Sequence, residues 1–137
     1  MSDNTLKDPQ IFISQEARSL FDNLKRIEEF KCLENKDLFM LALLFGINKD
    51  KIPIKKQDRT QSGFTRERYL SDKDMNVLKA IAVSEKDDIS IINDIPGIFS
   101  LAEEYANAGI KELKEFVYDN PADLTKKLSS KIKKALK

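Results

Sequence analysis

The clearest candidates for chemistry in this sequence are the seven lysine and arginine side chains between residues 49 and 70. The same stretch contains three acidic residues, so its formal net charge is +4. Cations in a polar segment are typical of contacts to nucleic-acid phosphates. The alternative is a surface loop whose charges only keep it soluble. The residues that we predict to bind nucleic acid are Lys55, Lys56, Arg59, Arg66 and Arg68.

The end of this basic segment adds aromatic rings to the cations. Phe64 and Tyr69 could stack on bases, and an extended chain over 64–69 would point Arg66 and Arg68 to the same side. A connection of this length between helices is usually functional or disordered.

Groups for catalysis are scarce by comparison. The chain has no histidine, so the commonest general base and metal ligand is missing, and Cys32 has no second cysteine to pair with. Glu103 and Glu104 are adjacent, so on a helix their carboxylates point in different directions. We therefore expect no enzymatic activity, no cofactor and no metal site. The rival from the enzyme class is a small nuclease or other enzyme. Two segments match a fragment of one nuclease motif, Glu34-Asn35-Lys36 and Glu112-Leu113-Lys114, but such matches are expected by chance in a chain rich in Glu and Lys, and no strand with an aspartate precedes either.

Composition and patterning predict the scaffold that positions these residues. The chain has the 137 residues of one domain, 41% hydrophobic residues are enough for a core, and only four glycines and four prolines favour helices. The start of the chain is polar and has no apolar run typical of a signal peptide, so we expect a cytoplasmic protein. Apolar periodicity predicts a mainly α fold, a compact domain of about five helices with a short N-terminal strand.

Two helices are expected before the basic segment. Ser14 is a suitable N-cap for the first, whose apolar stripe begins at Ala17. The second, from about Lys36 to Phe45, is apolar on every side, so we expect it to be buried all round, and Gly46 stands where a helix-ending glycine would. It is too short to cross a membrane, which takes about 20 apolar residues. The side chains expected in the core are Leu38, Met40, Leu41, Leu43, Leu44 and Phe45.

Three helices are expected after the basic segment. Ser71, with Asp74 three residues on, predicts the start of the third helix. The fourth reaches about Tyr118, and the fifth follows Asn120-Pro121 as a basic amphipathic helix that we expect to dock on its own domain. Small residues on the fourth helix would let the second approach closely, and they are Ala102, Ala106 and Gly109. The predicted organisation is a disordered N-terminus (1–9), a helical domain (10–120) with a basic loop (47–70), and the C-terminal helix (121–137).

The short strand is predicted over Ile11, Phe12 and Ile13, and it leaves two arrangements open. A short strand followed by two helices matches a ribbon-helix-helix unit, in which two chains pair their strands into a ribbon that enters the DNA major groove. A strand that reads bases needs polar side chains, and all three residues here are apolar. The alternative is a small strand that closes a monomeric core.

Charge is strongly segregated along the rest of the chain. Residues 71–120 have a net charge of −6, and residues 121–137 have a net charge of +5. Charge blocks of this kind bear on partners and on electrostatic steering, and they say little about the fold.

Three segments together resemble a known family. They are Asp37–Gly46 (DLFMLALLFG), Ala80–Glu85 (AIAVSE) and Ala102–Gly109 (AEEYANAG). In order and spacing they resemble the small proteins associated with Dnd systems, which place sulfur in the DNA backbone and restrict unmodified DNA. The resemblance covers over half the chain and leaves out the Lys-rich tail. It implies an accessory role in bacterial DNA modification or phage defence, and it carries no catalytic motif.

We therefore expect a non-catalytic accessory protein of a DNA phosphorothioation-type defence system that contacts the DNA backbone through the basic loop. The alternative is an adaptor subunit that bridges larger nuclease or ATPase defence proteins without touching DNA. The expected partners are DNA and other defence-system proteins, with no membrane, and a homodimer is left open. The residues expected to serve a protein partner are Glu103, Glu104 and Asn107.

Overall fold

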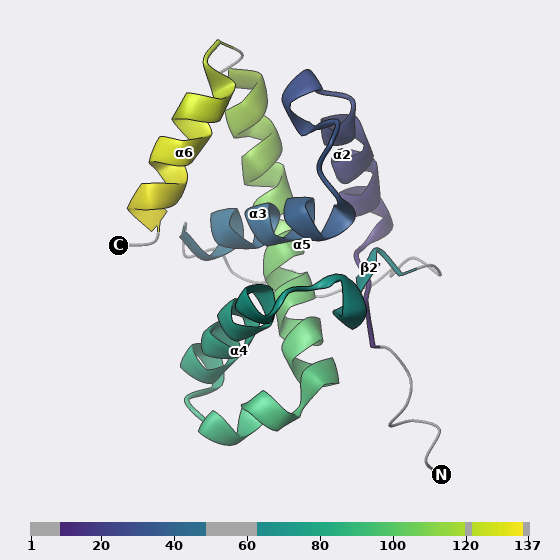
Figure 1. Cartoon of the computed structure of the whole chain (residues 1–137), viewed down its shortest axis with the longest axis vertical. Coiled ribbons are helices and arrows are strands. Elements are labelled where there is room, and N and C mark those ends of the chain that lie inside the picture. The colour runs from purple at the N-terminus through teal and green to yellow at the C-terminus, as the bar shows by residue number, and fades with distance from the viewer. Residues whose placement is uncertain (1–8, 49–62, 120–121, 136–137) are drawn as a thin grey trace.

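The computed structural model describes residues 9–48, 63–119 and 122–135, and these residues form a mainly helical protein with one small antiparallel sheet (Figure 1). This architecture confirms the predicted fold class. In chain order the described elements are β1 (Gln10–Ile11), α2 (Gln15–Lys25), the 3-10 helix η1 (Glu28–Phe30), α3 (Asn35–Asn48), β2 (Thr65–Arg66), η2 (Glu67–Tyr69), α4 (Asp72–Lys86), η3 (Ile89–Asn93), α5 (Ile95–Asp119) and α6 (Leu124–Ala135).

The centre of the fold is the crossing of α3 and α5. In Figure 1, α5 runs along the long axis of the molecule and α3 lies across it. A Cβ atom placed at Gly109 would overlap the carbonyl oxygen of Ala42, and one placed at Gly46 would overlap that of Tyr105. The two glycines therefore let the backbones touch, which confirms the close approach predicted from the small residues of α5.

Gly46 does not end α3, so this part of the prediction is wrong. The helix continues to Asn48, and none of the described glycines has a positive φ. A glycine inside a helix costs about 0.5–1 kcal/mol relative to alanine. The contact with Tyr105 of α5 explains the glycine here, because any side chain would push the two helices apart.

The burial of α3 follows one helical face, so the expectation of burial all round is also wrong. Leu38, Leu43 and Phe45 are buried, together with Phe39 and Ala42. The apolar side chains on the remaining face are only partly buried, and they include three that were expected in the core: Met40, Leu41 and Leu44.

The N-terminal strand pairs within the chain. β1 and β2 are antiparallel, with Gln10 opposite Arg66 and Ile11 opposite Thr65. The amide of Phe64 extends the pairing by donating to the carbonyl of Ile11 at 2.7 Å. β1 therefore pairs with a strand of its own chain, as expected for a small strand that closes a core, and the ribbon-helix-helix arrangement stays a prediction.

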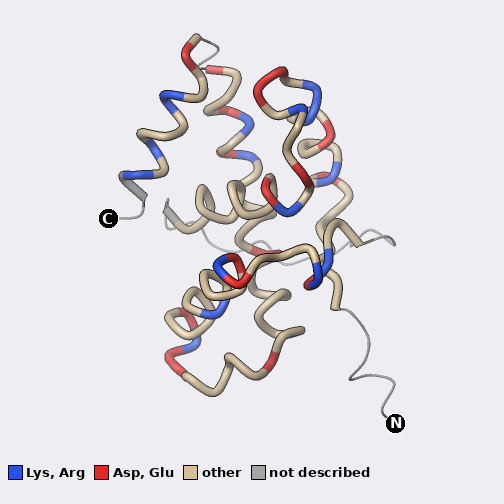
Figure 2. Tube along the Cα trace, viewed as in Figure 1, with Lys and Arg blue, Asp and Glu red and all other residues tan. Residues whose placement is uncertain are grey.

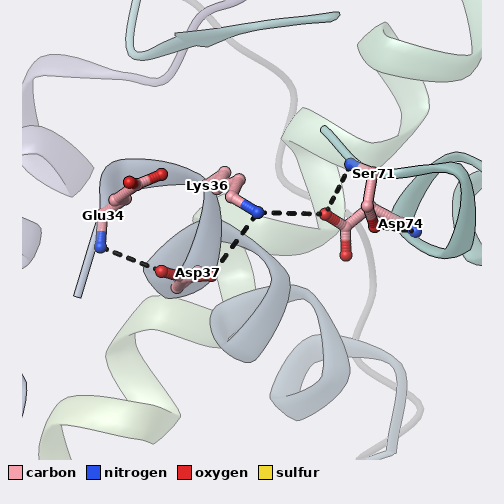
Figure 3. A network of polar contacts seen from close by, with 5 residues as sticks. All are labelled: Glu34, Lys36, Asp37, Ser71 and Asp74. Carbon is pink, nitrogen blue, oxygen red and sulfur yellow. Dashed lines mark hydrogen bonds and ion pairs between the residues drawn. The ribbon is translucent and has the colours of Figure 1, made fainter. Parts of the chain in front are cut away.

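Side-chain caps place α2 and α4 as predicted. The hydroxyl of Ser14 accepts a hydrogen bond from the amide of Ala17 at 3.0 Å, and Ser71 and Asp74 form both bonds of a capping box at 3.1 Å. Lys36 Nζ lies 3.7 Å from Asp74 Oδ2, so the first turns of α3 and α4 are joined (Figure 3). The start of α4 is thereby fixed to the central helices.

α6 docks on its own domain, as expected. Leu124 and Leu128 are buried, and Lys131 Nζ lies 5.5 Å from the ring centroids of both Phe45 and Phe116. Three expectations concern residues outside the described ranges: the disorder of 1–8, the cap at 120–121 and the apolar role of Leu136.

Candidate nucleic-acid interface

The structure describes two of the five residues predicted to bind nucleic acid. Arg66 ends β2 and is half-buried, whereas Arg68 lies on η2 and is exposed. The strand covers only 65–66 before the chain turns into a 3-10 helix, so the extended run considered over 64–69 does not form. The other three predicted residues lie outside the described ranges: Lys55, Lys56 and Arg59.

Phe64 belongs to the core, which corrects its predicted role as a base-stacking group. Its side chain is 3% exposed, and its ring centroid lies 4.6 Å from that of Phe21. Its carbonyl accepts a hydrogen bond from Asn35 Nδ2 at 2.8 Å, which ties this segment to the start of α3. Tyr69 is the ring that stays accessible, with 52% exposure, and the guanidinium carbon of Arg68 lies 5.3 Å from its centroid.

Two cations of α2 border the same phenylalanine. The guanidinium carbon of Arg18 lies 5.3 Å from the ring centroid of Phe64, and Lys25 Nζ lies 5.9 Å from it. Residues seven apart are about two turns apart, so both side chains leave one face of α2. We call Arg18, Lys25, Arg66 and Arg68 the α2–β2 basic surface.

Sequence reasoning missed the contribution of α2 to this surface. The seven-residue spacing of Arg18 and Lys25 was the available signal, because it places two cations on one helical face. Nothing local links that face to Phe64, which is about 40 residues further along the chain. The ring of Phe64 packs against Phe21 of α2, and this contact places Arg18 and Lys25 beside the segment that continues into Arg66.

Carboxylates modify the charge of this region without removing it. Glu16 on α2 pairs with Lys111 of α5 at 3.7 Å, and Glu67 separates the two arginines of β2 and η2 in the sequence. A second concentration of cations lies on α6, where Figure 2 shows only lysines among the charged positions of the helix.

The residues expected to serve a protein partner hold the N-terminal segment instead. Glu103 and Asn107 are 1% and 2% exposed. Glu103 Oε2 accepts a hydrogen bond from the amide of Phe12 at 2.8 Å, and Asn107 Oδ1 accepts one from the amide of Ser14 at 3.3 Å. A partner cannot reach these two side chains in the folded domain, which corrects that expectation for them. Glu104 is half-buried, and its role in partner binding stays a prediction.

The described residues include no candidate metal centre. No group of three or more cysteine, aspartate or glutamate side chains among them lies close enough to hold a metal ion. Cys32 is exposed, and none of the helices described is both long and apolar enough to span a membrane. The arrangement that the structure offers to a partner here is a set of cations on a packed scaffold.

Nearly the whole chain matches one protein family. Residues 10–136 fit the sequence model of the family described as DNA sulphur modification system-associated protein 4, and this range includes the Lys-rich tail that the resemblance had left out. No curated protein and no solved structure matches the chain. Because the match covers far more than half of the sequence, the chain belongs to the DNA sulphur modification system-associated protein 4 family.

Proposed function

We propose that this chain is a non-catalytic accessory protein of the DNA sulphur modification system that contacts the DNA backbone through the α2–β2 basic surface and the basic segment that leads to it. One observation carries the proposal. Arg18 and Lys25 of α2 border the ring of Phe64, and the chain then continues directly into Arg66 and Arg68. Cations from two distant parts of the sequence thus border, or closely follow, the same aromatic ring.

The scaffold under these cations is rigid, which favours binding. Phe64 is held by Phe21 and by the amide of Asn35, so the backbone that carries Arg66 is fixed. Cations on a fixed backbone lose less conformational freedom when they bind phosphates. Phosphate contacts position a protein without reading bases, so we expect binding with little sequence preference and a strong dependence on salt.

The absence of a catalytic role is part of the same proposal. The chain has no histidine, and Cys32 therefore has no imidazole to activate it. Glu103, the most buried of the candidate carboxylates, is committed to the amide of Phe12. A contribution to phage defence would come through other proteins of the DNA sulphur modification system, which would supply any bond chemistry.

The rival function is that of an adaptor between larger nuclease or ATPase proteins of the system, without contact to DNA. In that case the cations of the α2–β2 basic surface would bind acidic side chains of a protein. The two functions differ in one measurable property, because only the first predicts that the purified chain binds duplex DNA and releases counterions.

The test compares two double variants that lose the same charge, namely Arg18→Gln/Lys25→Gln on α2 and Lys79→Gln/Lys86→Gln on α4. Fluorescence anisotropy would measure their binding to a short DNA duplex at two salt concentrations, with circular dichroism as the control for folding. We expect roughly tenfold weaker binding for the α2 variant and a salt slope that is flatter by about 0.9 per lost phosphate contact. The α4 variant should bind like wild type.

Two results would count against the proposal. Equal losses in the two variants would show that only net charge matters and that the α2–β2 basic surface is not the contact. A wild-type chain that does not bind duplex DNA even at low salt would leave the adaptor function as the better explanation.

A further inference from the structure

The large aliphatic side chains that are exposed among the described residues belong to α4 and η3. Ile89 and Ile92 on η3 are 69% and 36% exposed, and Val77 on α4 is 39% exposed. The other exposed large apolar residues in the described ranges are two tyrosines. In a 3-10 helix, residues three apart lie one above the other, so Ile89 and Ile92 form an apolar ridge on one side of η3.

A carboxylate flanks the ridge at each end, Asp88 before it and Asp94 after it, and each accepts hydrogen bonds from nearby residues. Asp88 Oδ1 accepts hydrogen bonds from the amide of Ser90 at 3.0 Å and from its hydroxyl at 2.8 Å. These bonds lower the pKa of Asp88 from its ordinary value, so the group is ionised at neutral pH. Asp94 Oδ1 accepts from the amide of Gly97 at 3.1 Å, which holds it at the start of α5.

The segment that contains the ridge is acidic. Residues 84–94 contain one basic and four acidic residues, a net charge of −3. In Figures 1 and 2, η3 lies at the end of the long axis that is remote from α6 and its lysines. α4 precedes η3 in the chain, and the N-terminus of α4 is held by the ion pair of Asp74 with Lys36 and by the capping box of Ser71. The ridge therefore lies on η3, which packs against the anchored helix α4.

We infer that this α4–η3 end docks a basic segment of a partner protein of the DNA sulphur modification system, one in which an apolar side chain is flanked by lysine or arginine. An apolar centre with a polar rim is the usual arrangement of a protein interface. The carboxylates beside Ile89 and Ile92 favour a cationic partner over an acidic one, because complementary charge steers and orients association. This surface is separate from the α2–β2 basic surface, so one chain can hold DNA and a protein at once.

The first test uses a short synthetic amphipathic peptide of Leu and Lys as the probe, and the same peptide with Glu in place of Lys as its control. NMR spectra of the full chain would be recorded during each titration. We expect the Lys peptide to shift the amide signals of 84–94, and the Glu peptide to leave them in place. Shifts that occur only elsewhere, or equal shifts with both peptides, would overturn the inference.

Substitutions then test the ridge itself. Ile89→Ser/Ile92→Ser should weaken binding of the Lys peptide about tenfold, since the few residues that carry most of the binding energy cluster near the centre of an interface. Ile89→Ser alone is the variant to use if the double one folds poorly, because Ile89 is the more exposed of the two. Tyr118→Ser, which removes an exposed ring of α5, is the matched control and should bind like wild type. Unchanged affinity in the isoleucine variants would overturn the inference.

The last step replaces the peptide by the purified proteins of the system, added one at a time to the immobilised chain. A protein that binds the wild-type chain but does not bind the Ile89→Ser/Ile92→Ser variant supports the inference. A wild-type dimer that this variant converts to a monomer in analytical ultracentrifugation would make a second copy the occupant and would overturn it. Duplex DNA binding should be the same in both chains, so failure here is distinguishable from failure of the proposed DNA contact.

Discussion

Two segments differ in composition from the chain around them: 102–109 of α5, and 63–70, which contains β2 and η2. Their side chains have different roles in the folded chain. In the first, small residues admit α3, and Glu103 and Asn107 bind the backbone of the N-terminal segment. In the second, Phe64 enters the core while Arg68 and Tyr69 stay exposed. Packing accounts for the composition of the first segment, whereas Arg68 and Tyr69 of the second stay accessible to a partner, with the guanidinium carbon of Arg68 5.3 Å from the ring centroid of Tyr69.

This difference separates residues that determine stability from residues that are available to partners. Polar side chains in a helical motif can be interior hydrogen-bonding groups, as Glu103 and Asn107 are. Exposed cations contribute little to folding, so their positions are better explained by what they bind. The predictions below test this separation, from the largest expected effect to the smallest.

The strongest test of the interior role is Gly109→Leu. A Cβ atom at this position already overlaps the carbonyl of Ala42, so a leucine must force α3 and α5 apart. We expect a loss of about 3 kcal/mol or more in the free energy of unfolding, or no folded protein. Urea denaturation followed by circular dichroism measures it. Glu115→Leu on the exposed face of α5 introduces the same side chain and should change stability little.

A smaller effect distinguishes the two faces of α3. Leu43 is fully buried, so Leu43→Ala should lower the free energy of unfolding by about 2–5 kcal/mol through cavity formation. Leu44 is only partly buried, so Leu44→Ala should cost clearly less. Equal losses for the two variants in the same denaturation experiment would show that α3 is buried on both faces, as its composition alone suggests.

The hydrogen bond of Glu103 provides a local test. Glu103→Ala leaves the partly buried amide of Phe12 without its carboxylate acceptor, which should cost about 1–3 kcal/mol. Hydrogen exchange at Phe12 should become faster in this variant and stay unchanged in Glu104→Ala. If Glu103→Ala kept wild-type stability and exchange but lost a protein partner, the side chain would serve the interface originally expected for it.

The smallest expected effect concerns Asp88 at the exposed end of the molecule. Hydrogen bonds from Ser90 lower its pKa in the folded chain, so the associated stabilisation is present above the ordinary pKa of aspartate and is lost as pH falls through the lowered value. Ser90→Ala removes the hydroxyl, which is the largest cause, and should raise the pKa of Asp88 toward its ordinary value. An NMR titration of the carboxyl group measures the shift, and an unchanged pKa would contradict this cause.

Local signals in the sequence were sufficient for much of the fold. Ser14, Ser71 and Asp74 cap helices as predicted, because a cap depends on residues within one turn. The periodicity of α5 was also readable, since the helix keeps one apolar face along its length. The family resemblance drawn from Asp37–Gly46 and two later segments is confirmed by the match over 10–136.

The remaining features depend on which elements meet in space. Three features depend on residues far apart in the chain: β1 pairs with β2, Gly46 lies against Tyr105 inside a helix, and Glu103 is buried against the amide of Phe12. The contacts of Arg18 and Lys25 with Phe64 are of the same kind. Periodicity within a single element does not contain this information. The sequence therefore predicted Arg66 and Arg68 of the candidate site but not Arg18 and Lys25.

The central claim is that the α2–β2 basic surface, together with the basic segment that leads to it, contacts the DNA backbone. The salt dependence of duplex binding tests this claim most directly. The measurement is the slope of the logarithm of affinity against the logarithm of salt concentration for wild type and for Arg59→Gln/Arg66→Gln/Arg68→Gln. We predict weaker binding to all duplex sequences alike and a slope that is flatter by up to about 0.9 per lost phosphate contact, with unchanged thermal stability. Identical isotherms for the two chains at both salt concentrations would contradict the account.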